Sequence, residues 1–323
     1  MANASNLLPP SCILHFRPVC IAGPTAVGKS EIALRLAEQQ GGEIISVDSM
    51  QVYRGLDIGT AKPTAADRVR VPHHLIDICD LTESFDAAQF ARLAHRAVAE
   101  IQSRGHVPML CGGTGLYFKA FREGLDEMPS ADIELRAELE ATPLEKLLEE
   151  LRERDPATYR RIDKRNPRRV VRAVEVLRLT GKPLSEVRSR KSEIRCQKPA
   201  FVCLTRQPDD LRRRIDGRVD EMFARGLVDE ARELLKRGLG QNKTATQAIG
   251  YRQVVEHLRG ERSLEETIEL VKSRTRQFAK RQLTWFRAQK GLDWISLKPE
   301  ESVEKHVQKI GDVIQHRGAE TQR

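Results

Sequence analysis

The stretch from residue 19 to residue 31, V-C-I-A-G-P-T-A-V-G-K-S-E, constrains the fold of this chain more than any other. Residues 19–22 form a short apolar run that suits a buried strand, and residues 31–37 have the apolar spacing of a helix. The loop between them fits G-x-x-x-x-G-K-[ST], and this pattern forms a P-loop when it connects a strand to a helix. The sequence therefore predicts an α/β fold that begins with a phosphate-binding loop.

Each part of this loop has a chemical use. Gly23 and Gly28 allow turns that point successive N–H groups inward, and the helix N-terminus adds its positive end. Lys29 brings a cation, and the Ser30 hydroxyl can hold Mg²⁺. We expect a di- or triphosphate to bind here, on Gly23, Pro24, Thr25, Ala26, Val27, Gly28, Lys29 and Ser30. The motif does not identify the reaction, because kinases, ATPases and other transferases all use such loops.

Further apolar runs predict the other strands of a parallel sheet flanked by helices. They are residues 43–47, 71–78, 107–111, 201–205 and 293–297. Helical spacing covers residues 85–103, with Ser84 as a possible cap, and residues 211–235, with a break near Gly226.

Polar or glycine-rich residues follow two of these strands at the edge where open parallel sheets bind ligands. Asp48 ends the strand at 43–47 and is either a functional carboxylate or the N-cap of a following helix. Residues 112–115, Gly-Gly-Thr-Gly, follow the strand at 107–111. This second glycine loop either cradles substrate or makes a tight turn.

Composition is that of a globular protein, with 40% hydrophobic and 31% charged residues and no apolar run of membrane-spanning length. The six cysteines lack C-x-x-C spacing, which favours a reducing cytoplasm and argues against a zinc site. His73 and His74 have no ligand partners at suitable spacing, so a structural role is favoured over metal binding. We expect an N-terminal leader (1–18), the first part of the core (19–124), a helical insertion rich in Glu, Arg and Leu (125–198), the second part of the core (199–300), and a C-terminal helix and tail (301–323).

The net charge of +9 is concentrated in two stretches. Residues 160–172 carry seven basic residues and one acidic residue, which fits either a solvated helix end or an anionic partner. Residues 272–290 carry seven basic residues and no acidic ones, interleaved with Phe278, Trp285 and Phe286. A face of one sign with aromatic residues favours nucleic acid. Arg214 and Arg218, four residues apart, share a helix face that is either functional or solvated and paired with nearby acids.

Six blocks of this sequence together resemble the tRNA dimethylallyltransferase (tRNA isopentenyltransferase) family in its bacterial form. These blocks are residues 23–30, residues 45–63 (I-S-V-D-S-M-Q-V-Y-R-G-L-D-I-G-T-A-K-P), residues 112–117 with 167–169, residues 249–253 (I-G-Y-R-Q), and residues 280–287 (K-R-Q-L-T-W-F-R). The resemblance implies a P-loop nucleoside-triphosphatase-like fold with a helical insertion. It also implies transfer of a dimethylallyl group from dimethylallyl diphosphate to N6 of adenosine 37 in tRNAs that read codons starting with U, with Mg²⁺ as cofactor. Ser30 stands where many members have Thr, and Gly115 where some have a larger residue.

The resemblance also implies roles for individual residues, and we expect the enzyme to be a monomer. Asp48 would accept a proton from the acceptor amine, Thr25 would donate to the oxygen that links phosphate to the prenyl carbon, and Arg218 would close on the diphosphate. The residues implied to contact tRNA are Asp48, Ser49, Met50, Gln51, Thr114, Arg136, Arg168, Arg169, Val170, Val171, Arg172, Gln247, Ala248, Ile249, Gly250, Tyr251, Arg252, Lys280, Arg281, Gln282, Leu283, Thr284, Trp285, Phe286 and Arg287.

Other functions fit the P-loop alone. A small-molecule kinase would leave the basic aromatic segment near the C-terminus unexplained. A nucleic-acid-dependent ATPase would need an apolar strand ending in Asp, and only residues 44–48 offer a weak candidate. Prenylation of free AMP or ADP would use the same donor but would not need the helical insertion.

Overall fold

The computed structural model describes residues 17–124, 129, 132–184, 186–187, 199–242 and 244–320, without the side chains of 133 and 316–320. The expected leader therefore falls almost wholly outside the described residues, as do Cys12 and Cys196. In chain order the elements are β1 (Val19–Ala22), α1 (Lys29–Gln40), β2 (Gly42–Val47), α2 (Ala65–Arg70), β3 (His73–His74), α3 (Ala87–Ser103), β4 (Val107–Gly112), α4 (Gly115–Glu123), α5 (Ile133–Ala141), α6 (Leu144–Arg154), α7 (Pro156–Arg161), α8 (Pro167–Thr180), β5 (Ala200–Thr205), α9 (Pro208–Ala224), α10 (Leu227–Lys236), the 3₁₀ turns η2 (Leu239–Gln241) and η3 (Ala245–Gln247), α11 (Tyr251–Leu258), α12 (Leu264–Arg287), β6 (Asp293–Ser296) and α13 (Val303–Glu320).

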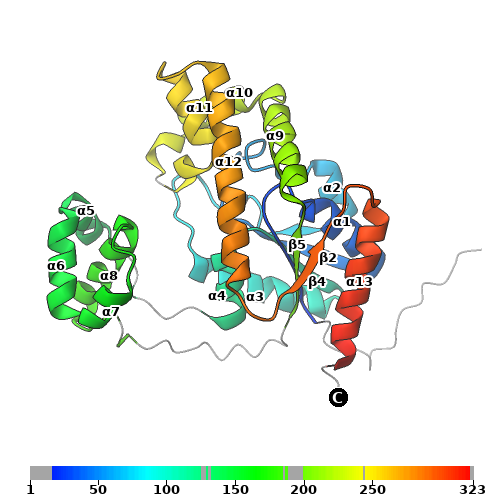
Figure 1. Cartoon of the computed structure of the whole chain (residues 1–323), viewed down its shortest axis with the longest axis horizontal. Helices are drawn as coiled ribbons and strands as arrows, with labels where there is room; N and C mark the ends of the chain where they lie inside the picture. Colours follow the sequence, from blue (N-terminus) through cyan, green and yellow to red (C-terminus); the bar gives the residue numbers. More distant parts are fainter. Residues whose placement is uncertain are drawn as a thin grey trace, which may run out of the picture. The chain divides into compact units, whose positions relative to one another are not determined.

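A parallel sheet of six strands, in the order β3-β2-β4-β1-β5-β6, carries the P-loop. Figure 1 labels β2, β4 and β5 of this sheet. The sheet confirms the predicted α/β class. The register places Ala22 of β1 beside Gly112 of β4, and Gly112 beside Val47 of β2. Because these three strands end level, the loops that follow them start at the same edge of the sheet. That edge carries the P-loop, Asp48 and the second glycine loop.

Helices cover both faces of this sheet, as successive residues of β5 show. Val202 belongs to the apolar cluster that includes Leu36 of α1 and Ile310 of α13. Phe201 points to the opposite face, since side chains alternate along a strand. There its ring meets the ring of Phe118 on α4, with 4.9 Å between centroids. Both sides of the sheet are therefore buried, as the continuous apolar strands require.

By its contacts the chain divides into a core unit, Met1–Arg122 with Arg195–Arg323, and a helical unit, Glu123–Ile194. The helical unit has a small core of its own, to which α5, α6 and α8 contribute Leu139, Leu151, Val170 and Val174. Asn166 caps α8 by accepting a hydrogen bond from the backbone N–H of Arg169, and Gly181 ends the helix in a left-handed conformation.

Two local predictions were wrong. The strand expected over residues 71–78 is reduced to His73–His74, because Leu75 and Asp77 adopt positive φ angles that interrupt an extended chain. The helix expected from residue 85 starts at Ala87 and is capped by Asp86 rather than by Ser84, with Asp86 Oδ1 accepting from the backbone N–H of Ala88 and Gln89.

Other predicted elements are present with extended ends. The region at 211–235 consists of α9 and α10, which are separated at Gly226, where φ is 94°. The basic stretch at 272–290 lies mostly on α12, which begins earlier, after the capping residue Ser263. No helix within the described part of the chain is long and apolar enough to cross a membrane.

A buried carboxylate, Glu43 of β2, joins the amino end of the sheet to its surroundings. Its oxygens lie 2.6 Å from His74 Nε2, 2.7 Å from Arg104 Nη2 and 2.7 Å from His106 Nδ1. Burial alone would raise the pKa of Glu43, but the hydrogen bonds from Arg104, His74 and His106 lower it to about 2. Ionised Glu43 therefore stabilises the fold.

Replacing Glu43 by Gln is expected to lower the free energy of unfolding at neutral pH by about 2 kcal/mol, since it removes the charge from these hydrogen bonds. Because the pKa in the folded state lies below the ordinary value of 4.5, the contribution of Glu43 is fully present above that value and is lost as pH falls toward 2. Denaturant unfolding across this range should show the variant and the parent converging at low pH. Glu153→Gln, at an exposed site on α6, is the control, and equal stability at neutral pH would contradict the prediction.

Candidate active site

The P-loop between β1 and α1 has a backbone shape that requires glycine at both glycine positions of its motif, Gly23 and Gly28. Gly23 has a φ of 146°, and a Cβ there would lie 2.6 Å from the carbonyl oxygen of Leu204 on the adjacent strand. Gly28 has a φ of 108° and precedes the first residue of α1. Larger residues would be strained at both positions, so the backbone can curl closely around a ligand.

A cavity of about 600 Å³ opens beside this loop. It is lined by the P-loop, by the loop after β2 and by one face of α9, through residues Ala26, Gly28, Lys29, Ser30, Glu31, Ile58, Ala61, Arg214, Gly217, Arg218, Glu221, Met222 and Arg225. Four of these residues are cations and two are acids. The cavity therefore has the size and the charge to hold a small molecule that carries phosphate groups.

Three arginines from beyond β5 donate to the P-loop itself. Arg206 Nε donates to the carbonyl of Val27 at 2.7 Å, and Arg214 Nε to that of Ala26 at 3.0 Å. Arg218 Nη1 lies 3.5 Å from Thr25 Oγ1. Arg214 and Arg218 thus lie on the face of α9 that lines the cavity, so the functional interpretation of this pair is favoured over a purely solvated face.

Two cations at the cavity, Lys29 and Arg218, are buried in a way that favours binding of an anion. Lys29 Nζ donates to the carbonyl of Pro24 at 2.6 Å, within its own loop. Burial, reinforced by the nearby charge of Arg218 and opposed by Cys111 and Asp48, lowers the pKa of Lys29 to about 8. Burial also lowers the pKa of Arg218. A bound diphosphate would favour the charged form of both groups, because negative charge nearby offsets their desolvation.

Asp48 lies at the end of β2, beside the P-loop, and does not cap a helix. Its Oδ1 accepts from the backbone N–H of Met50 at 2.8 Å and from that of Gln51 at 3.3 Å. These bonds hold the carboxyl group at the start of a turn. The second carboxylate oxygen, Oδ2, has no hydrogen bond to the part of the chain that the structure describes, so it can accept a proton or a hydrogen bond from a ligand.

Two side chains clamp the loop that forms the opposite wall of the cavity, residues 57–61. Glu230 of α10 accepts from the backbone N–H of Ile58 at 3.0 Å, and the hydroxyl of Tyr251 accepts from that of Gly59 at 3.1 Å. The Tyr251 hydroxyl in turn donates to Glu230 at 2.5 Å. A Cβ on Gly59 would lie 2.5 Å from the Tyr251 ring, which explains glycine at this position.

Tyr251→Phe is expected to raise the KM for a phosphorylated donor by about 2–10-fold, because it leaves the N–H of Gly59 without its acceptor and loosens the wall that carries Ile58 and Ala61. Affinity for RNA should not change, since Tyr251 is fully buried. The measurement is steady-state kinetics against the donor together with RNA binding. Tyr159→Phe in the helical unit is the control, and a loss of RNA affinity without a change in donor KM would contradict the assignment.

The basic surface of α12 divides into a neutralised part and a free part. Lys272 pairs with Asp220 at 2.8 Å, and Arg276 with Asp216 at 3.0 Å, both on α9. Further along the helix, Lys280, Arg281 and Arg287 are exposed and have no carboxylate partner among the described residues. Fewer basic residues of this segment are therefore available to an anionic partner than its composition indicates.

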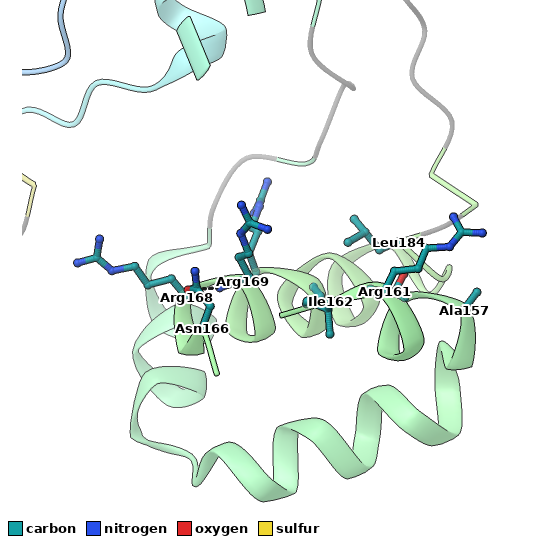
Figure 2. A pocket seen from close by; sticks show the side chains of 10 residues that line it. Ala157, Arg161, Ile162, Asn166, Arg168, Arg169 and Leu184 are labelled. Carbon is teal, nitrogen blue, oxygen red and sulfur yellow. Dashed lines mark hydrogen bonds between the residues drawn. The ribbon is translucent and has the colours of Figure 1, made fainter. Parts of the chain in front are cut away.

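A second basic surface lies on the helical unit (Figure 2). Arg161 at the end of α7 and Arg168 and Arg169 at the start of α8 line a hollow of about 490 Å³, with Ile162 and Leu184 among its apolar residues. These three arginines form no ion pair with any described carboxylate. In contrast, Arg136 and Arg172 both lie 2.5 Å from the buried Glu175, so their charge is partly neutralised within the unit; Arg172 also lines the hollow.

Several other residues expected at the RNA have buried side chains. They are Val170, Val171, Ala248, Tyr251, Gln282 and Phe286. Because these side chains pack inside the protein, they are not accessible to RNA in this structure. Arg252, Gln247, Thr284 and the free basic residues of α12 are exposed.

Sequence reasoning did not single out Arg206, Glu230 or the loop at 57–61 as parts of the site. Arg206 could have been found, since it follows β5 at the same sheet edge as Asp48 follows β2. Glu230 could not, because nothing local distinguishes it from the other acids of α10.

The described residues contain no cluster of three or more His, Cys, Asp or Glu that could hold a metal. His73 Nδ1 lies 2.7 Å from the carbonyl oxygen of Val71, and His74 contacts Glu43, so both histidines have structural partners. Ser30, exposed at the cavity, offers one hydroxyl. This donor set fits Mg²⁺ held chiefly by phosphate oxygens and water, as is common for this ion.

The sheet, the glycine loop and the basic cavity define a P-loop protein whose site suits a phosphorylated ligand. The chain belongs to the IPP transferase family, whose model matches residues 51–289. It is similar to the tRNA dimethylallyltransferase of Halorhodospira halophila, with 49% identity over 278 residues, 84% of this chain and 90% of that protein. It also resembles the full-length tRNA isopentenylpyrophosphate transferase of Bacillus halodurans (TM-score 0.70, 40% identity, 95% of this chain and 100% of that one) and a eukaryotic dimethylallyltransferase acting on tRNA (TM-score 0.75, 28% identity, 93% and 80%).

Proposed function

We propose that this chain transfers a dimethylallyl group from dimethylallyl diphosphate to N6 of adenosine 37 in tRNAs that read codons starting with U. The products are N6-dimethylallyladenosine and diphosphate. One observation carries the proposal most directly: an anion cavity and a free carboxylate oxygen, on Asp48, lie at the same edge of the sheet in a member of the IPP transferase family. An enzyme acting on tRNA in this way would work in the cytoplasm, and nothing in the proposal requires more than a monomer.

The lining of the cavity suggests how the leaving group is stabilised. The diphosphate would lie against the P-loop, with Lys29 and Arg218 neutralising its charge as the bond between oxygen and the prenyl carbon breaks. Thr25, beside Arg218, would donate to the bridging oxygen. Mg²⁺, held by Ser30 and the phosphate oxygens, would add a further positive charge.

The acceptor is a weak nucleophile, because the lone pair on adenine N6 is delocalised into the ring. As N6 bonds to the prenyl carbon it must lose a proton, and Asp48 is the carboxylate placed to accept it. The base must leave its stack to reach this point, as in other enzymes that modify bases.

A transfer assay tests the proposal as a whole. The protein would be incubated with radiolabelled dimethylallyl diphosphate, Mg²⁺ and unmodified tRNA, and the digested RNA examined for N6-dimethylallyladenosine. Product next to the anticodon is expected. Product only on free AMP or ADP would show that the acceptor is a free nucleotide. ATP turnover without prenyl transfer would favour a kinase or an ATPase, two functions that membership of the IPP transferase family does not favour.

The hollow on the helical unit supplies a prediction about RNA. Reversing Arg168 and Arg169 to Glu should weaken tRNA binding and reduce the slope of log affinity against log salt by about 1–2, since each phosphate contact contributes nearly one to that slope. Lys146→Glu with Arg152→Glu, at exposed sites on α6, makes the same change in net charge away from this surface. Equal slopes in both double variants would exclude a specific role for Arg168 and Arg169.

A further inference from the structure

Gln282 connects the P-loop to the second glycine loop from a position on α12. Its Oε1 accepts from the backbone N–H of Thr25 at 2.9 Å, and its Nε2 donates to the carbonyl of Gly113 at 3.0 Å. The side chain is buried. The orientation of the amide follows from these partners, because a backbone N–H can only donate and a carbonyl can only accept.

The second glycine loop is shaped around α12. A Cβ on Gly113 would lie 2.3 Å from Gln282 Nε2, and a Cβ on Gly115 would lie 2.3 Å from the ring of Trp285. Glycine at these positions therefore allows one helix to approach closely. This favours the tight-turn interpretation of the loop over a direct cradle for substrate.

Within a single turn, α12 thus carries two kinds of residue that face different ways. Lys280 and Arg281 are exposed and positively charged, whereas Gln282 faces inward to two loops at the ligand edge of the sheet. Thr25, the partner of Gln282, also lies within reach of Arg218 at 3.5 Å. A change at Gln282 would therefore reach Thr25, the residue that the proposed function places next to the leaving oxygen.

We propose that Gln282 is a positioning residue that holds Thr25 and Gly113 in register for the transfer step, rather than a contact for RNA. The inference rests on the proposed function. Its effect on the reaction is indirect: it fixes the backbone of Thr25, and the Thr25 hydroxyl and Arg218 act on the donor.

The first test is Gln282→Met, which keeps the length of the side chain and removes both hydrogen bonds. With RNA and donor both saturating, kcat is expected to fall about 10–100-fold, the usual cost of misplacing a reacting group slightly, while RNA affinity stays unchanged. Arg281→Met, one residue away, should instead weaken RNA binding. Gln308→Met, on the surface of α13, is the control for the substitution itself.

A second variant reaches the same contact from the other side. Gly113→Ala should displace the Gln282 amide and lower kcat in the same way, and the double variant should be no worse than the poorer single one, because both changes break one connection. Losses of kcat that multiply in the double variant would overturn the proposal, as would a loss of RNA affinity in Gln282→Met that matches its loss of kcat.

A measurement that does not use the reaction separates this inference from the proposed function. Hydrogen exchange at the Thr25 amide should be faster in Gln282→Met than in the parent, whatever the enzyme transfers. If exchange is faster in Gln282→Met but the parent protein forms no dimethylallyladenosine, the proposed function is refuted while the contact between Gln282 and Thr25 is supported. Unchanged exchange would refute the positioning role.

Discussion

Asp48→Asn is expected to lower kcat for prenyl transfer by about 10²–10⁴-fold, the range for loss of a general base, while tRNA still binds. Asn keeps the oxygen that accepts from the backbone of Met50 and Gln51, so the turn after β2 should persist. What it removes is the capacity to take the proton from N6. The measurement is single-turnover transfer with donor and tRNA both saturating.

Two comparisons make the result specific. Asp132→Asn, at the N-cap of α5, is the matched control, because Asn caps a helix as well as Asp does. Asp48→Ala would in addition remove the hydrogen bonds of the turn and should be less stable than Asp48→Asn. If Asp48→Asn retained full activity, Asp48 would be a structural residue and another group would have to accept the proton.

Arg218→Met is expected to lower kcat by about 10²–10³-fold, as is typical when one donor to a developing negative charge is removed. Arg218 lies on the cavity face of α9, within 3.5 Å of Thr25 Oγ1, and its positive charge would face the departing diphosphate. Inhibition by inorganic diphosphate should weaken in parallel, since the same charge stabilises the product.

The same helix provides the control for Arg218. Arg213 is largely exposed, at 75%, and lies 3.8 Å from Asp210, away from the cavity lining. Arg213→Met should therefore leave both kcat and diphosphate inhibition unchanged. Arg218→Lys should recover only part of the loss, because a single ammonium cannot reproduce the spread of donors on guanidinium. Equal behaviour of Arg213→Met and Arg218→Met would contradict the role of Arg218.

The sequence alone was sufficient for those parts of the protein that depend on local pattern. The P-loop could be recognised because its glycines, its lysine and its flanking strand and helix are contiguous. Asp48 could be placed beside it because the carboxyl ends of parallel strands meet at one edge, a rule that needs only the positions of the strands. The α/β class and the helices found within residues 133–180 follow from apolar periodicity, which is also local.

Only the tertiary structure decided which way the individual side chains of these motifs face. Gln282 stands within a basic segment expected to contact RNA, yet its amide is bound by Thr25 and Gly113, which lie 257 and 169 residues away in the chain. The side chains of Val170 and Phe286, also expected to contact RNA, are buried among apolar residues. Likewise, the clamp of Glu230 and Tyr251 on Ile58 and Gly59 has no local signature. The physical reason is that burial and hydrogen-bond partners arise when distant segments pack together, and a pattern read along the chain contains spacing but not that packing.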